Sequence, residues 1–210
     1  MKTRNIIMIV VVATIFVTAG VLVAVGVATH TEEGLLTACQ TADGRFDYEG
    51  DCEEVKWDPS QFPLQVHATT TNPHPPSDPE SATRSVISLV NSRLGFRALQ
   101  WTDDSSSADI SVRIGEAQVV GSSMGDANGD ASHFVRDGSL RCEIRTWNTG
   151  TVEMLDKVLT HEMGHGLGLA HDPDYEGSAM YPTVTPDGAR LTRLRITDHD
   201  RGLLRELYNQ

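Results

Sequence analysis

The stretch LTHEMGHGLGLAHDPD, residues 159–174, places three histidines, one glutamate and three glycines within sixteen positions. His161 and His165 are four residues apart, so on a helix they project from one face about one turn apart. We therefore predict a helix from about Val152 to Leu167. Gly168 would end this helix in a left-handed conformation that costs no Cβ clash, and the chain would return to bring His171 beside the first two histidines.

Three imidazoles in this arrangement can hold one Zn²⁺ at about 2.0–2.1 Å and leave a fourth position open, as catalytic zinc sites require. Glu162 would lie beside the metal without binding it. Zinc lowers the pKa of bound water to about 7, and Glu162 is placed to accept a proton from that water. The sequence therefore predicts one catalytic zinc held by His161, His165 and His171, with Glu162 as general base. Chance agreement of all five motif positions, Gly168 included, is remote.

The order H-E-x-x-H-x-x-G-x-x-H, followed by a methionine, resembles the metzincin signature. The methionine here is Met180 in SAMYP. Within the metzincins the chain is most similar to the matrixins, the matrix-metalloproteinase-like group. Four stretches carry this resemblance, which extends over about residues 62–210: SADISVRIG, GDASHF, SAMYP and ITDHDRGLLRELY.

The resemblance implies a zinc endopeptidase with an α+β, metzincin-type catalytic domain. We expect a twisted mixed sheet, an active-site helix and a C-terminal helix. Met180 would form an apolar floor under the metal, and Tyr181, Pro182 and Thr183 would line the pocket for the side chain that follows the cleaved bond. An extended peptide substrate would lie antiparallel to an edge strand within HFVRDGSLR, residues 133–141.

The chain also departs from the matrixin pattern. The residues around Cys39, TACQTADG, are unlike the family's cysteine motif that blocks the zinc, so we expect no latency of that kind. Matrixins hold a second, structural zinc with several histidines and an aspartate, whereas only His133 falls in the corresponding run here. We expect that second site to be absent or altered. His30, His67, His74 and His199 have no partner at ligand spacing and are interpreted as surface or incidental residues.

The loop DANGDAS, residues 126–132, offers Asp126, Asn128 and Asp130 at alternate positions, a spacing that calcium loops use. Ala131 stands where such a loop would have glycine. Either a Ca²⁺ site or a solvated acidic turn fits this pattern.

Elsewhere the pattern predicts alternating strands and helices. Residues 62–70 alternate like a strand, and residues 80–95 have apolar residues at helical spacing with Ser77 or Asp78 as cap. A hairpin is expected to turn at Asp137-Gly138, and a final helix to begin after Thr197. Cys142 is interpreted as a buried thiol in a strand.

The N-terminal region reads as an export signal. Residues 6–28 are apolar and uncharged behind Lys2 and Arg4, long enough to span a bilayer. We predict a signal-anchor over residues 1–29 with everything after it outside the cell. The alternative is a cleaved signal peptide and a secreted protein. Residues 30–61 are expected to form an extracellular stalk, with a Cys39–Cys52 disulfide loop as an option, and residues 62–210 to form the protease domain.

The formal net charge is −12, with 3 lysines among the 17 basic residues. A surface this acidic argues against nucleic-acid binding. Such a composition resembles that of secreted proteins from salt-loving archaea, although an ordinary acidic extracellular domain also fits. Two functions fit the sequence: a zinc endopeptidase acting on peptides or proteins, and a zinc-loaded cell-surface binding module without turnover. The intact Glu162 favours the first.

Overall fold

The computed structural model describes residues 37–40, 46–47, 53–115, 129–147, 151–175, 177–182 and 195–208. Its main element is a five-stranded mixed sheet in the order β5-β4-β6-β8-β7. The strands are β4 (Leu64–Thr70), β5 (Leu99–Trp101), β6 (Ile110–Ile114), β7 (Gly129–Arg136) and β8 (Ser139–Thr146). Four of them are parallel, and β7 runs antiparallel to β8. The predicted mixed sheet with helices is confirmed.

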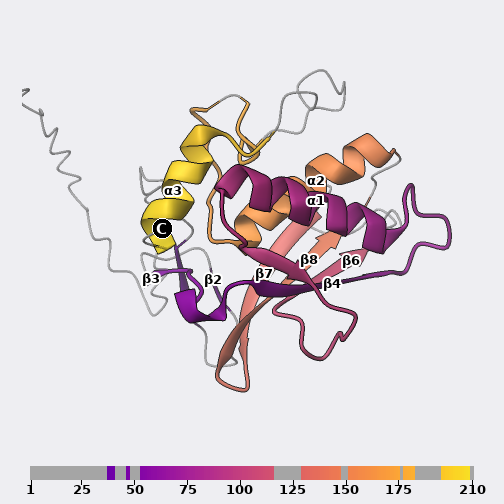
Figure 1. Ribbon diagram of the computed structural model, residues 1–210, viewed down its shortest axis with the longest axis horizontal. Coiled ribbons are helices and arrows are strands. Elements are labelled where there is room, and N and C mark those ends of the chain that lie inside the picture. The colour runs from indigo at the N-terminus through magenta and orange to yellow at the C-terminus, as the bar shows by residue number, and fades with distance from the viewer. Residues whose placement is uncertain are drawn as a thin grey trace, which may run out of the picture.

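Two helices cover one face of this sheet (Figure 1). Helix α1 (Pro79–Leu94) packs on β4 and β5, α2 (Val152–Gly166) packs on β7 and β8, and the two helices contact each other. The alternation in β6 explains this layering, because Ile110, Val112 and Ile114 are buried beneath the helices while the residues between them are exposed. Helix α3 (Asp198–Tyr208) packs against α1 and closes the chain.

Local sequence signals define the ends of these elements. Asp78 caps α1 by accepting a hydrogen bond from Ser81 N, and Gly95 ends the helix with φ of 78°. The predicted hairpin turn is confirmed: Asp137 and Gly138 both have positive φ, as a two-residue turn between twisted strands requires. The thiol of Cys142 is buried in β8, as predicted.

The region predicted as a stalk contains short strands among its described residues. Strands β1 (Thr37–Gln40), β2 (Phe46–Asp47) and β3 (Glu53–Glu54) form a small antiparallel sheet, and β2 lies against β7. A 3₁₀ turn (Pro59–Gln61) then leads into β4. Val55 and Trp57 are buried, so the packed core begins before Phe62. Strands of two to four residues are too short to show a hydrophobic period, so this sheet was not predictable from the sequence.

Several predicted features fall outside the described residues. These are the signal-anchor at residues 1–29, Cys52 of the proposed disulfide loop, Asp126 and Asn128 of the acidic loop, and Thr183 of the substrate pocket. Within the part of the chain that the structure describes, none of the helices is long and apolar enough to cross a membrane.

Candidate metal centre

Helix α2 carries the first half of the motif. Thr151 caps it by accepting a hydrogen bond from Met154 N, and Lys157 forms an i,i+4 ion pair with Glu153 on its exposed side. Most apolar side chains of the helix, among them Leu155, Leu159 and Met163, are buried, and the helix packs on the sheet and α1, so one helical face is fixed in the core. His161 and His165 project together from this anchored helix.

The helix ends in a Schellman turn at Gly168. The N–H of Gly168 donates to His165 O at 2.8 Å, and the N–H of Leu169 donates to Gly164 O at 3.0 Å. Gly168 has φ of 97°, which confirms the predicted left-handed conformation. The turn reverses the chain and brings His171 back to the face of α2 that carries the other two histidines.

The three imidazoles converge. His161 Nε2 lies 3.1 Å from His165 Nε2 and 3.3 Å from His171 Nε2. Nitrogens bound tetrahedrally to one zinc at about 2.05 Å stand roughly 3.3 Å apart, so the spacing fits a shared ion. Among the described residues this is the one group of three or more metal-ligating side chains with its ligand atoms within 4.8 Å of one another. The residues present therefore fit zinc.

Backbone carbonyls orient two of these rings. His161 Nδ1 lies 2.6 Å from Ala179 O, and His165 Nδ1 lies 2.7 Å from Leu169 O. Because only a protonated nitrogen can donate to a carbonyl, these contacts place the ring proton on Nδ1 and leave the Nε2 lone pair for a metal. Burial lowers the pKa of His161 to about 4 and that of His165 well below its ordinary value. Both rings are thus neutral and able to bind metal at neutral pH.

Glu162 lies beside this cluster in a nearly dry environment. The side chain is buried, and β7 approaches it so closely that a Cβ atom on Gly129 would stand 2.7 Å from Glu162 Oε1. Burial, with a smaller contribution from the charge of Asp130, raises the pKa of Glu162 to about 8. A cation held by the three imidazoles would act in the opposite direction, because a nearby positive charge favours the carboxylate.

The comparison with known families agrees with this geometry. The family model for matrixins matches residues 56–209, which is most of the chain. The chain belongs to the matrixin family. No curated protein shows a significant match to it.

The methionine turn of this matrixin domain lies under the histidines. Met180 is buried, and a Cβ atom on Gly164 would collide with Met180 Sδ, so the glycine leaves the space that the methionine fills. The Met180 N–H donates to Ser178 Oγ, and Ser178 Oγ donates to Asp200 Oδ1 at 2.6 Å. Asp200 is fully buried in α3, so the C-terminal helix fixes the methionine turn.

The remaining predicted positions belong to the substrate pocket and to the possible calcium site. Tyr181 is partly exposed and Pro182 exposed directly after the buried Met180, next to the histidine cluster in sequence. Asp130, predicted for calcium, is bound by the Arg145 guanidinium through both carboxylate oxygens. A Ca²⁺ ion would therefore compete with an arginine for this carboxylate.

Two histidines have roles that the sequence did not reveal. His133 is buried with Nε2 3.3 Å from Gly166 O, at the end of α2. His199 is exposed, as its interpretation as a surface residue predicts, but it also has partners: its Nε2 lies 2.9 Å from Asp172 Oδ2, and its ring stacks on Tyr175. Both partners are far away in sequence or on another element, so neither pairing has a spacing signal.

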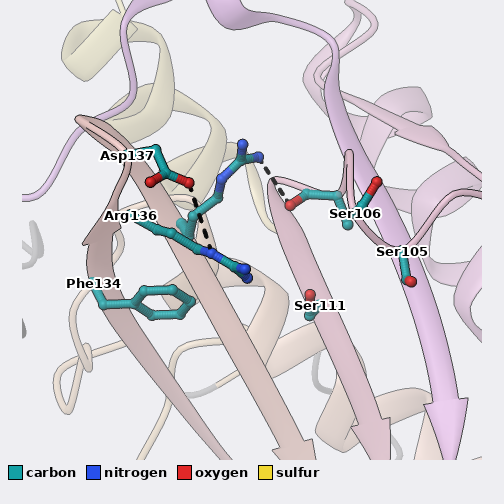
Figure 2. Close-up of a pocket in the computed structure, with 8 residues that line it drawn as sticks. Ser105, Ser106, Ser111, Phe134, Arg136 and Asp137 are labelled. Carbon is teal, nitrogen blue, oxygen red and sulfur yellow. Dashed lines mark hydrogen bonds and ion pairs between the residues drawn. The ribbon is translucent and has the colours of Figure 1, made fainter.

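A recess of about 110 Å³ lies on the other face of the sheet, where Phe134 and Arg136 of β7 face Ser111 of β6 (Figure 2). Arg141 also lines the recess, and its guanidinium already donates to Ala108 O and to Asp109 Oδ1. The side chains that alternate with these in β6 and β7 point toward the helices, so the sheet separates this recess from the histidine cluster. We assign it no part in the chemistry.

Proposed function

We propose that this matrixin domain is a zinc-dependent endopeptidase that hydrolyses peptide bonds. The observation that carries the proposal is the convergence of three neutral imidazole nitrogens next to a buried glutamate. Structural zinc sites use four protein ligands, whereas the described cluster supplies three, which is the catalytic pattern. When bound there, zinc would act as a Lewis acid and make a water molecule acidic enough to attack at neutral pH.

In this mechanism Glu162 moves the protons. Its carboxylate accepts a proton from the attacking water and later delivers it to the leaving amine. The close approach of Gly129 restricts the carboxylate to a narrow space, and the buried setting strengthens its hydrogen bonds to the reacting atoms. The carbonyls of Ala179 and Leu169 hold the histidine rings in place throughout.

The sheet edge supports an extended peptide as substrate. Strand β7 is the last strand of the five-stranded sheet and packs on α2, so the part of its outer edge that the two-residue β2 does not cover offers backbone groups to a substrate. We propose that the substrate pairs with this edge in the antiparallel direction. Tyr181, Pro182 and Thr183 would then line the pocket for the residue after the cleaved bond.

The test compares two glutamates of the same helix in the full chain. Glu162→Gln should retain about one zinc per protein but lose cleavage of an unfolded, fluorescently labelled protein by at least about 100-fold, since general base catalysis contributes about 10²–10⁴-fold. Glu153→Gln is the control, because Glu153 is exposed and its change leaves the metal centre intact. Equal cleavage by Glu162→Gln and the parent would refute the mechanism.

The competing function, a surface binding module, makes a different prediction. A zinc-loaded parent protein that cleaves no member of a broad peptide library, yet captures a protein partner, would replace the endopeptidase proposal.

We also propose, from the sequence alone, that residues 1–29 anchor the domain in the cell membrane with the protease outside. Alkaline carbonate extraction of membranes tests this: an anchored chain stays in the pellet, whereas a chain cleaved after its signal is found in the medium.

A further inference from the structure

The turn that follows α2 has all of its helix-end carbonyls bound. The last four carbonyls of a helix lack partners within the helix, and a buried carbonyl without a partner is costly. Gly164 O and His165 O accept from the N–H groups of the Schellman turn itself. Gly166 O and Leu167 O remain, and side chains from distant parts of the chain bind them.

Trp57 and Tyr208 supply the shorter of these bonds, and His133 Nε2 also lies 3.3 Å from Gly166 O. The indole Nε1–H of Trp57 donates to Gly166 O at 2.8 Å, and the hydroxyl of Tyr208 donates to Leu167 O at 2.7 Å. The backbone of Trp57 also hydrogen-bonds to the Tyr208 hydroxyl, so the two side chains form one network. Trp57 is 1% and Tyr208 2% exposed, so both bonds lie away from bulk solvent.

The same two segments enclose the turn sterically. A Cβ atom on Gly168 would stand 2.5 Å from Val55 O and 3.0 Å from Leu207 Cδ2. The segment before β4 and the end of α3 therefore pack closely against Gly168, which leaves no room for a side chain there.

This turn determines where two of the metal-binding rings lie. Leu169 O, within the turn, accepts the hydrogen bond from His165 Nδ1 at 2.7 Å, and His171 follows two residues later. A displacement of the Gly166–Gly168 backbone would therefore move the partner of one ring and the attachment of another.

We propose that Trp57 and Tyr208 are positioning residues of the metal centre, which hold the post-helix turn so that His165 and His171 converge with His161. The proposal rests on the zinc centre proposed above. Outer partners of metal ligands typically contribute about 10–100-fold in metal affinity, and here the bonds act through the backbone of the turn.

The test measures zinc affinity of the full chain by competition with a chromophoric chelator, together with the visible absorption spectrum of the Co²⁺-substituted protein. Tyr208→Phe removes one hydroxyl and keeps the ring. We expect zinc affinity to fall by about 10-fold or more and the Co²⁺ bands to shift, because the ligand geometry changes. If Tyr208→Phe does not fold, the same two measurements are made on Trp57→Phe at low temperature. This variant tests the indole bond to Gly166 O.

Asp78→Ala is the matched control, since it removes the cap of α1 and lowers stability without touching the turn. Its zinc affinity and Co²⁺ spectrum should equal those of the parent. Unchanged affinity and spectrum in a folded Tyr208→Phe protein would overturn the positioning role, as would an equal loss in Asp78→Ala. Failure of the parent protein itself to bind zinc would instead refute the proposed function.

Discussion

Gly129 of β7 lies directly against Glu162 of α2. A Cβ atom on Gly129 would stand 2.7 Å from Glu162 Oε1 and 2.8 Å from Val158 Cγ1. The strand that we propose to bind substrate is thus also the wall that confines the proposed general base. The backbone of β7 would therefore position both the paired substrate peptide and the Glu162 carboxylate.

Gly129→Ala should therefore displace the Glu162 carboxylate. We expect kcat/KM on a peptide substrate to fall by about 10–100-fold, because misplacing a catalytic group by about 1 Å can cost that much. Zinc content should stay at the parent level, since the histidines are not moved. Gly202→Ala is the control: a Cβ atom there meets nothing within 4 Å, and activity should be unchanged. Full activity of Gly129→Ala would contradict the confinement of Glu162.

Gly164 and Gly166, two of the three glycines between His161 and His171, should respond differently to alanine. Gly164→Ala would drive a methyl group into Met180 Sδ, so we expect a loss of about 1–3 kcal/mol in the free energy of unfolding. Gly166→Ala would meet Ile144 Cδ1 at 3.4 Å and should be tolerated far better. Urea denaturation of both variants measures the difference, and similar stability of the two would show that Met180 yields easily.

Asp200 should be needed for the methionine turn. Its carboxylate accepts hydrogen bonds from Ser178 Oγ, from Thr197 N and from Thr197 Oγ1, all within 2.8 Å. Asp200→Asn would turn an amide N–H₂ toward some of these donors, and we expect the free energy of unfolding to fall by about 1–3 kcal/mol. Asp198→Asn, at an exposed position of the same helix, should change stability little. The denaturant midpoints of Asp200→Asn and Asp198→Asn measure this difference in stability.

His133 should make the protein less stable in acid. Burial lowers the pKa of His133 from an ordinary 6.5 to about 4. Between these values the unfolded chain binds a proton that the folded chain rejects, so stability is full above about pH 6.5 and is lost as the pH falls toward 4. Between pH 6.5 and pH 4, His133→Gln should lose less free energy of unfolding than the parent. The difference between the two losses should be at most about 3 kcal/mol. Unfolding of both proteins in chelator from pH 7 to pH 4.5 tests this, and parallel pH profiles would exclude the effect.

The sequence alone determined the chemistry and the local geometry of the motif. The four-residue spacing of His161 and His165, the position of Glu162 and the left-handed Gly168 all depend on bonds within a few residues, and local backbone geometry sets them. The hairpin at Asp137-Gly138 and the cap at Asp78 were predictable for the same reason.

The tertiary structure decided what surrounds that motif. Trp57 and Tyr208 bind carbonyls that are 109 and 41 residues away, Gly164 makes room for Met180, and His199 pairs with Asp172. None of these contacts has a characteristic spacing, because packing brings the partners together only after the sheet and helices have formed. The sequence therefore determined which atoms could bind a metal, whereas the folded chain determined what holds them in place.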